Sequence, residues 1–152
     1  MNAFIYRLKS ALSCFVLVAL AAVIPALAQA QPELGGQPVK ALTSNSSGAL
    51  LVLRDSGLFA IDGHAATEIP LPPSDSGAQP TSLAKGADGT TYLAGPGLGV
   101  WRYNSANESW QSLNNTLPDL EVTAIAAHAT QPETVYAYLG EKGMFRSRDG
   151  GA

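Results

Sequence analysis

Short apolar runs separated by polar turns make up most of the chain. The runs LLVL, TYLA and VYAYL are typical, and each is followed within a few positions by glycine, proline or aspartate. An amphipathic helix would instead need apolar residues at i, i+3, i+4 and i+7, and no stretch after residue 30 has that pattern. The pattern therefore predicts an all-β domain built from short antiparallel strands.

The same order of runs and turns occurs three times. Each copy begins with a small and an aliphatic residue, continues through a polar turn and an apolar run, and closes with a glycine turn and an apolar pair. The aliphatic position is Leu42, Leu83 or Ile125, so the spacing is 41 and then 42 residues. The other corresponding positions are Leu51, Tyr92 and Tyr136, the glycines Gly57, Gly99 and Gly143, and the closing pairs Leu58/Phe59, Val100/Trp101 and Met144/Phe145.

A repeat of this length that holds four strands is the size of a β-propeller blade. Residues 41–152 are therefore predicted to form a partial β-propeller of four-stranded antiparallel blades, with about two and a half blades present. We expect each closing pair to begin an equivalent strand and to send one side chain to each face of its sheet. Trp101 and Phe145 are expected to bury the larger area.

The last residues of the chain resemble the Asp-box (BNR) repeat proteins, which include sialidase-like, sortilin-like, xyloglucanase-like and photosystem-II assembly-factor-like propellers. The motif of these families is S-x-D-x-G-x-x-W, in the turn between the last two strands of a blade. Ser147, Asp149 and Gly151 match it in order, and its tryptophan would fall two residues beyond Ala152. The resemblance implies that these 152 residues are an N-terminal fragment that stops inside an Asp box.

The register of the box can be carried to the two earlier repeats. In the second repeat, where only the tryptophan matches, it falls on Tyr103, Ser105, Asn107 and Trp110. In the first repeat, where the box is lost, it falls on Ile61, Gly63, Ala65 and Glu68. A short acceptor side chain in such a turn can bond backbone N–H groups, and a glycine two residues later admits positive φ. Asp149 is therefore interpreted as a structural residue, with the aromatic residue of the box packed between blades.

The first thirty residues have the three parts of a secretory signal peptide. Arg7 and Lys9 precede an apolar run over residues 11–24, and small residues follow it. The run is shorter than the ~20 residues of a membrane-spanning helix. We predict a signal-peptide helix over residues 1–30, cleaved after Ala28 or Ala30, a linker over 31–40 and the blades over 41–152. The mature protein is then secreted or periplasmic, with no membrane association.

Several kinds of chemistry are disfavoured by the composition. The lone cysteine, Cys14, leaves with the signal peptide, which excludes disulfides, thiol catalysis and cysteine–zinc sites. The remaining seven basic residues against twelve acidic ones give no basic patch for nucleic acid. His64 and His128 have no second ligand at metal spacing, and GPGLG at 95–99 lacks the lysine and helix of a phosphate loop. We therefore predict neither a metal nor a cofactor.

Two classes of function remain open. The first is a non-enzymatic exported propeller that binds a protein or glycan partner, and it is favoured because the repeats show turn-forming residues and no convergent catalytic set. The second is a glycoside hydrolase, xyloglucanase-like or sialidase-like, whose catalytic residues lie mostly in blades outside this sequence. No catalytic residue is assigned, and the acidic residues, Asp55, Asp62, Asp88, Asp119 and Glu121, mostly fall in turns.

Export provides a direct test of the N-terminal interpretation. We expect a mature chain that begins at Gln29 or Gln31 outside the cytoplasm, because charged, apolar and small-residue regions follow one another in the order that signal peptidase requires. N-terminal sequencing of the exported protein measures this. Recovery of intact Met1 from exported material would contradict it.

Overall fold

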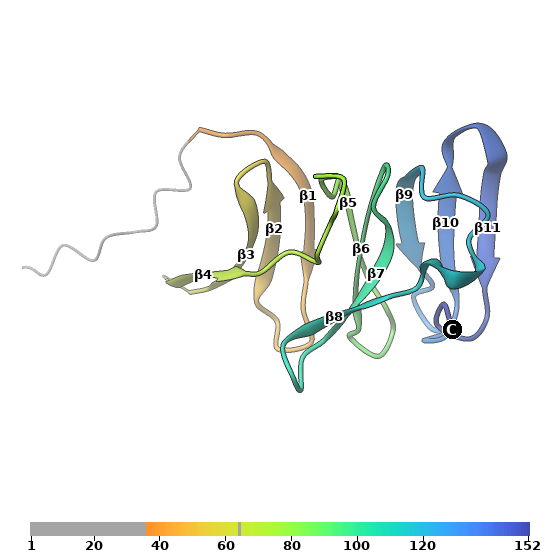
Figure 1. The fold of residues 1–152 in the computed structure, drawn as a ribbon. Helices are drawn as coiled ribbons and strands as arrows, with labels where there is room; N and C mark the ends of the chain where they lie inside the picture. Colours follow the sequence, from red (N-terminus) through yellow and green to blue (C-terminus); the bar gives the residue numbers. More distant parts are fainter. Residues whose placement is uncertain (1–35, 64) are drawn as a thin grey trace, which may run out of the picture.

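The computed structural model describes residues 36–63 and 65–152, which form three antiparallel sheets arranged in a row (Figure 1). The all-β prediction is confirmed. The expected signal-peptide helix, residues 31–35 of the expected linker and His64 lie outside the described residues. Within the described part of the chain, no helix is long and apolar enough to cross a membrane.

Each repeat folds into one sheet whose strands are neighbours in chain order. The first sheet contains β1 (Val39–Ser44), β2 (Leu50–Arg54), β3 (Gly57–Asp62) and β4 (Ala65–Ile69). The second contains β5 (Ser82–Lys85), β6 (Thr91–Gly95), β7 (Gly99–Asn104) and β8 (Ser109–Ser112). The third contains β9 (Val122–Ala127), β10 (Val135–Leu139) and β11 (Gly143–Ser147). Two short 3-10 helices, η1 (Asn114–Thr116) and η2 (Gly140–Lys142), complete the described elements.

The strand registers confirm that the repeats are equivalent. Paired residues in neighbouring strands share a face of the sheet, so each ladder identifies one structural position. The aliphatic positions fall in the same row of each sheet, which reads Leu42–Val52–Phe59, Leu83–Leu93–Trp101 and Ile125–Ala137–Phe145. The period found in the sequence is therefore the period of the fold.

The first strands of the sheets lie side by side. The Lys85 ammonium at the end of β5 donates to Ser44 Oγ at 3.2 Å and to the Asn45 carbonyl at 3.0 Å. The backbone N–H of Ile125 in β9 donates to Ser82 Oγ in β5 at 3.1 Å. Sheets that meet at their first strands and stack face to face have a β-propeller-like arrangement.

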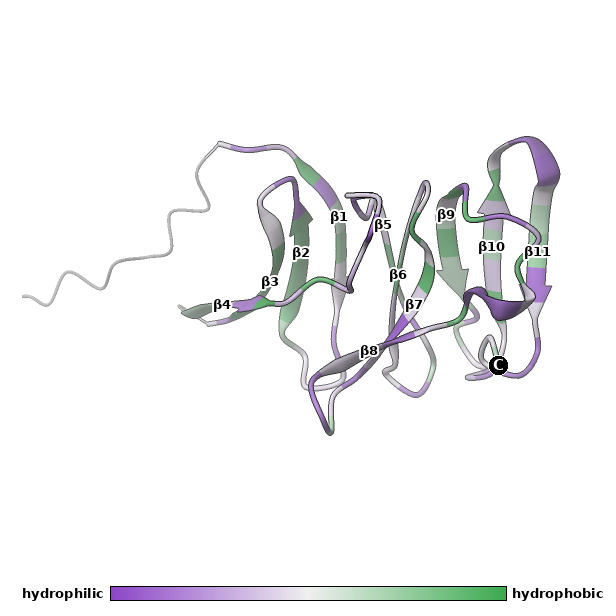
Figure 2. Cartoon of the chain, in the orientation of Figure 1, coloured by the Kyte–Doolittle hydropathy of each residue, from purple (hydrophilic) through white to green (hydrophobic). Residues whose placement is uncertain are grey.

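Two apolar clusters hold the three sheets together. The cluster between the first and second sheets includes Leu53, Leu58 and Leu93, all fully buried. The cluster between the second and third sheets includes Tyr92 and Val122, which are also buried. Figure 2 shows hydrophobic residues along β2 and β9 and hydrophilic residues at the turn between β10 and β11. Each sheet therefore buries its apolar residues against its neighbour.

The turn between β6 and β7 is fixed by a residue from the next connector. Gly99 has φ +74°, and a Cβ there would lie 2.1 Å from Asn114 Oδ1. The Asn114 amide accepts the N–H of Val100 at 2.7 Å and donates to the Leu98 carbonyl at 3.1 Å. Residues 95–99 form the hairpin turn between β6 and β7, and Gly99 needs to be glycine because of both its backbone angle and the close contact.

The closing pairs begin equivalent strands and divide between the two faces, as expected. In the third sheet Phe145 is half-buried while Met144 is 70% exposed. In the second sheet Val100 is the more completely buried residue, at 5% exposed, and Trp101 is half-buried. Trp101 is held in this half-buried position by a hydrogen bond from its indole N–H to the Leu98 carbonyl at 2.9 Å.

Leu42 and Leu83 occupy the same row of their sheets and provide a matched test of packing between sheets. Leu83 is 9% exposed and Leu42 is 57% exposed. We expect Leu83→Ala to lower the free energy of unfolding by about 2–5 kcal/mol and Leu42→Ala to lower it by about 0.5 kcal/mol or less. Urea unfolding of the two variants measures the difference, and equal losses would show that contact between sheets does not stabilise the fold.

Candidate binding site

The three matched Asp-box residues lie in one turn after β11. Ser147 is the last residue of the strand, and its hydroxyl donates to Asp149 Oδ1. The same Oγ accepts the N–H of Gly151 at 2.8 Å, and Asp149 Oδ1 accepts this N–H at 3.3 Å. The side chains of Ser147 and Asp149 thus accept backbone N–H groups of the turn.

Gly151 also lies against the connector that leaves the second sheet. Its φ is +89°, and a Cβ at this position would come within 2.6 Å of Leu113 Cδ1. The preceding N–H, of Gly150, donates to the Glu133 carbonyl at 2.7 Å. A side chain at position 151 would therefore both strain the backbone and push the turn away from Leu113.

Hydrogen bonding keeps the Asp149 carboxyl ionised. The Ser147 hydroxyl lowers its pKa below the ordinary value of 3.8, and backbone N–H groups of the turn lower the pKa further. The turn therefore prefers the carboxylate, because its Oδ1 accepts hydrogen bonds from both the Ser147 hydroxyl and the Gly151 N–H. This arrangement is that of a turn anchor.

The equivalent turn of the second sheet is built differently. Asn104 Oδ1 accepts the N–H of Ala106 at 3.0 Å, and the Ser109 hydroxyl donates to Asn107 Oδ1 at 2.7 Å. Glu108 has φ +51°, a left-handed conformation that is uncommon for a residue other than glycine. Among the described residues of this turn, the Ser105 side chain forms no hydrogen bond. Asn104 and Asn107 instead supply the side-chain acceptors that Ser147 and Asp149 supply in the third sheet.

Trp110 lies between the first and second sheets. It packs against the apolar cluster shared by these sheets, and its ring centroid is 4.9 Å from that of Tyr103. Its indole N–H donates to the carbonyl of Pro70, in the connector from the first sheet, at 2.7 Å. One side chain therefore joins β8 to both the preceding sheet and its connector.

The register expected for the first repeat is wrong by two residues. Asp62 pairs with Ala65, so the hairpin has a two-residue turn, and Ala66 lies opposite Ile61. In the second sheet Trp110 lies opposite Tyr103 because Asn104 pairs with Ser109 across a longer turn. The counterpart of Trp110 is thus Ala66 and not Glu68.

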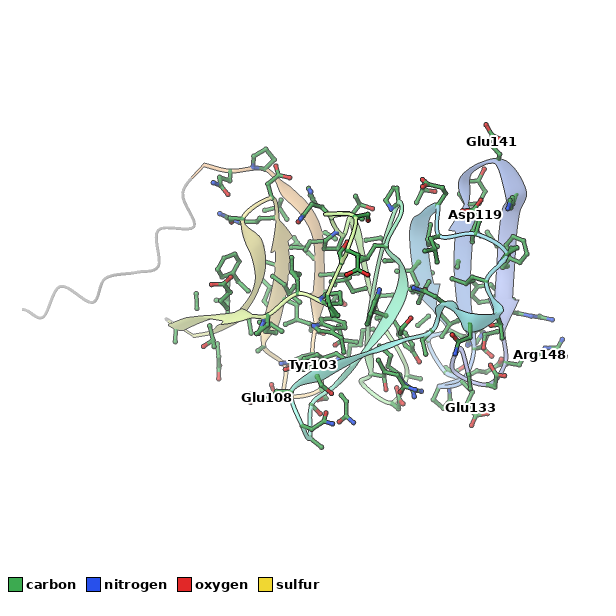
Figure 3. The ribbon with its side chains drawn as sticks, in the orientation of Figure 1. Tyr103, Glu108, Asp119, Glu133, Glu141 and Arg148 are labelled. Atoms are coloured by element: carbon green, nitrogen blue, oxygen red, sulfur yellow. The ribbon has the colours of Figure 1, made fainter. Side chains whose placement is uncertain are left out.

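A polar cavity of about 330 Å³ opens between the first and second sheets at the end where these turns gather. Figure 3 shows Tyr103 and Glu108 at this end of the sheets, and Asp119 and Glu141 at the opposite end. The polar residues that line it come from three turns and from β6, β7 and β8, and they are Asn45, Ser46, Asp88, Thr90, Thr91, Arg102, Tyr103, Asn104, Ser105 and Gln111. We call this cavity the polar pocket.

The polar pocket combines fixed charges with neutral donors and acceptors. Burial would raise the pKa of Asp88, but hydrogen bonds from the backbone and side chain of Thr90 outweigh it, so the pKa lies below 3.8. Arg102 donates to Gln111 Oε1 at 2.6 Å. Burial, followed by the charge of Glu108, raises the pKa of Tyr103 above 10.0, so its hydroxyl stays protonated at neutral pH. The pocket can therefore both donate and accept hydrogen bonds.

The sequence did not identify the polar pocket. Asp88 was assigned to a turn, which is correct, since its carboxylate bonds Thr90 N at 3.0 Å. The turns that form the pocket include Asn45, Asp88 and Ser105, and so belong to three separate hairpins. Only the antiparallel order of the strands, which returns every second turn to the same end of the sheets, could have indicated that they meet.

The described histidine is also a turn residue. His128 Nδ1 accepts the N–H groups of Thr130 and Gln131, both at 3.2 Å. Over residues 36–63 and 65–152, no group of three or more histidine, aspartate, glutamate or cysteine side chains is close enough to hold a metal ion. Nor do the polar-pocket residues include a second carboxylate beside Asp88.

Comparison with known proteins yields a likeness of fold. No protein-family model and no curated protein sequence matches the chain. An auxiliary nutrient binding protein from Bacteroides ovatus superimposes with a TM-score of 0.54 over 71% of this chain, at 12% identity. U3-55K and the RRP9 WD40 repeats overlap 74% of the chain, with TM-scores of 0.34 and 0.35 and identities of 13% and 12%. The chain spans 28%, 52% and 51% of these three structures.

Acid should weaken the turn from Ser147 to Gly151 through Asp149. Because its folded pKa lies below 3.8, the ionised carboxyl stabilises the turn above that pH, and the contribution is lost as the pH falls through the folded pKa. In Ser147→Ala we expect the Asp149 pKa to rise toward 3.8. Carboxyl-detected NMR titration measures this, with Ser109→Ala as the control. An unchanged Asp149 pKa in Ser147→Ala would contradict the hydrogen-bonded turn.

Proposed function

We propose that this protein is an exported, β-propeller-type binding module that recognises a protein or glycan partner through the polar pocket between its first two sheets. The observation that supports this most directly is the lining of the pocket, in which hydroxyl and amide side chains outnumber charged ones. Such groups fix the orientation of a ligand by hydrogen bonds. Export follows from the signal-peptide pattern of residues 1–30.

The charges of the polar pocket favour an uncharged ligand. Asp88 and Arg102 carry opposite charges, and the remaining polar side chains that line it are neutral. An anionic ligand would be repelled by Asp88 as well as attracted by Arg102. Hydroxyl and amide groups of a neutral ligand can hydrogen-bond to the carboxylate, the guanidinium, the hydroxyls and the amides of the pocket alike. A neutral oligosaccharide or a peptide backbone has this chemistry. A nutrient-binding role is stated for the Bacteroides ovatus protein of similar fold, and it is consistent with this proposal.

We also propose that the sheets are blades of an Asp-box repeat. The hydrogen bonds of Ser147, Asp149 and Gly151, and the place of Trp110 between two sheets, support this assignment. In this view the box residues stabilise turns, and the residues that contact the ligand are those that the turns position.

The hydroxyl of Tyr103 provides a selective test. Tyr103→Phe keeps the ring against Trp110 and removes one hydrogen-bonding group from the pocket, so we expect affinity to fall about threefold to tenfold. Calorimetric titration with β-glucan, xyloglucan and sialic-acid oligosaccharides and with unstructured peptides measures this. The control is Tyr136→Phe, which removes the same group from the third sheet, outside the pocket.

The same titrations can contradict the proposal. Equal affinity loss in both variants, or binding by none of these probes, would place recognition elsewhere. A parallel assay for sugar release covers the second class of function. Turnover of β-glucans or sialosides would replace the binding proposal with that of a glycoside hydrolase.

A further inference from the structure

The polar pocket lies between the two sheets that have four strands each, so both of its walls are complete within the described residues. The turns that carry its side chains are also fixed against each other. A Cβ at Gly89 would lie 2.7 Å from Ser46 Cβ, and the Lys85 ammonium donates to the Asn45 carbonyl at 3.0 Å. The pocket is therefore preformed, and its hydrogen-bonding groups are held in place before a ligand binds.

Three amide side chains that line the polar pocket use their oxygen atoms within the protein. Asn45 Oδ1 and Asn104 Oδ1 accept backbone N–H groups of their own turns, at 2.9 and 3.0 Å, and Gln111 Oε1 accepts the Arg102 guanidinium at 2.6 Å. Backbone N–H groups and a guanidinium can only donate, so the oxygen and not the nitrogen of each amide must face them. Each amide therefore offers its NH2 group, which has no hydrogen-bond partner among the described residues.

Acceptors in the polar pocket come from Asp88 and Thr90. The Thr90 hydroxyl donates to Asp88 Oδ2 at 2.7 Å, so the lone pairs of its own oxygen are left to accept. The Asp88 carboxylate takes one more bond, from the N–H of Thr90, and keeps further acceptor capacity. The hydroxyls of Ser46, Thr91 and Ser105 make no hydrogen bond within the described chain, and Thr91 is only 5% exposed. These three hydroxyls can therefore donate or accept.

The pocket also has a small apolar wall. Leu51, which is 2% exposed, and the half-buried Ile69 line it beside the polar groups. A methyl group of a ligand can be removed from water there. The volume of about 330 Å³ is close to the lower end of the range for small-molecule pockets, which is about 300–1,000 Å³. The pocket therefore suits one sugar residue that has a carbonyl, an N–H and a methyl group.

The cavity between the second and third sheets has a different chemistry. Its volume is about 440 Å³, and its walls include Val100, Leu113 and Phe145. None of the residues that line it is an asparagine or a glutamine. It therefore lacks the amide donors of the polar pocket.

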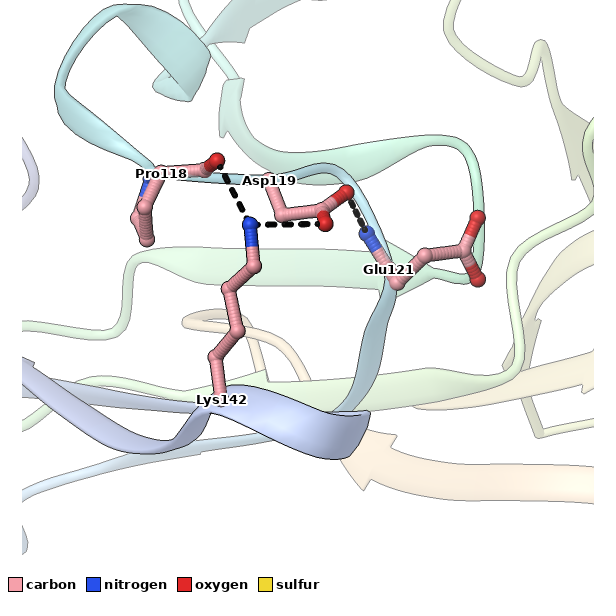
Figure 4. Close-up of polar contacts among 4 residues, drawn as sticks. All are labelled: Pro118, Asp119, Glu121 and Lys142. Carbon is pink, nitrogen blue, oxygen red and sulfur yellow. Dashed lines mark hydrogen bonds and ion pairs between the residues drawn. The ribbon is translucent and has the colours of Figure 1, made fainter.

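A further cavity, of about 260 Å³, is acidic. Asp119, Glu121 and Glu141 line it together with Lys142. The Lys142 ammonium lies 3.0 Å from Asp119 Oδ2 and donates to the Pro118 carbonyl at 3.1 Å (Figure 4). The N–H of Glu121 donates to Asp119 Oδ1 at 3.3 Å. These polar groups hold a connector to the third sheet, and among the three cavities the amide donors are found in the polar pocket alone.

We infer that the polar pocket binds an N-acetylated hexosamine of a neutral glycan. This inference rests on the binding function proposed above and specifies its ligand. The acetamido carbonyl accepts from the amide NH2 groups, its N–H donates to Asp88, and its methyl group packs against Leu51. The ring hydroxyls, which both donate and accept, pair with the free hydroxyls of the pocket.

A peptide backbone matches the pocket less completely. It has a carbonyl and an N–H in each residue but no hydroxyl groups, so it would leave Ser46, Thr91 and Ser105 without partners. A buried polar group that loses water without gaining a partner weakens binding. The glycan is therefore the favoured ligand, and a peptide is an alternative result of the test.

Two oligosaccharides that differ in one substituent provide the test. Each ring of chitotetraose has an acetamido group where cellotetraose has a hydroxyl group, and both sugars are neutral. In calorimetric titrations of the full chain, we expect chitotetraose to bind at least about tenfold more tightly, because the acetamido group adds hydrogen bonds and a buried methyl group. NMR spectra of the labelled protein should show shifts at Asn45, Thr91 and Asn104.

Substitution of asparagine by aspartate tests the amide donors. Asn45→Asp and Asn104→Asp keep the oxygen that accepts the backbone N–H of the turn and replace the donating NH2 group with an accepting oxygen. Each should reduce the preference for chitotetraose over cellotetraose about threefold to tenfold. The control is Asn115→Asp, the same change at an exposed position of η1 outside the pocket, which should leave the preference unchanged.

Failure of this inference differs from failure of the binding function. Equal affinity for the two sugars, with both weakened by Tyr103→Phe, would overturn the acetamido assignment and leave the pocket as a binding site for neutral glycans. Tighter binding of unstructured peptides than of chitotetraose would overturn it in favour of a peptide ligand. Binding of neither sugar, or an unchanged preference in both pocket variants, would also overturn it. The comparison of the two sugars needs no variant, so it holds even if a variant does not fold.

Discussion

The structure depends on apolar contact between facing sheets, because the two clusters that neighbouring sheets share contain nearly all of the buried apolar side chains. Leu53 and Leu58 of the first sheet are fully buried only because Leu93 and Leu83 of the second sheet cover them. Leu42 occupies the row of Leu83 on a face that no described sheet covers, and it is exposed. Repeat units of this kind gain stability from their neighbours more than from their own hydrogen bonds. The position of every turn relative to the next follows from this stacking.

Both cavities are consequences of the same stacking. Apolar rows meet in the middle of each interface, whereas the turns at one end bring polar side chains together. Between the first two sheets Trp110 fills the apolar part, and the space that remains near the turns is lined by Asp88, Arg102 and Tyr103. Between the second and third sheets the apolar part itself is open. The same sheet arrangement thus produces one mainly polar and one mainly apolar cavity. The two differ because different side chains from the turns and from β8 occupy each interface.

The fold could be predicted from the sequence further than the site could. Spacing alone predicted equivalent positions for Leu42, Leu83 and Ile125, because repeats that stack on one another must place their apolar residues at the same point of each sheet. It failed at Glu68, since a two-residue hairpin after Asp62 shortens the first repeat and puts Ala66 opposite Ile61. Nor does spacing show that Asn114 clamps the Gly99 turn, because that contact depends on a connector outside the repeated strands. The polar pocket was missed for the same reason, since its residues come from separate turns.

Turn length therefore determines what each interface contains. The longer turn after Asn104 is stabilised by its own asparagines and accommodates Glu108 at positive φ, and it sets β8 so that Trp110 lies opposite Tyr103 and its indole reaches the Pro70 carbonyl. The shorter turn of the first sheet puts the methyl group of Ala66 at that position, where it reaches nothing comparable. The turn that contains Ser147, Asp149 and Gly151 is built in a third way. Its glycine allows the turn to approach Leu113 closely at the rim of the cavity between the second and third sheets. Local hydrogen bonds in a few turn residues thus decide which apolar spaces between the sheets are filled by side chains of the described residues.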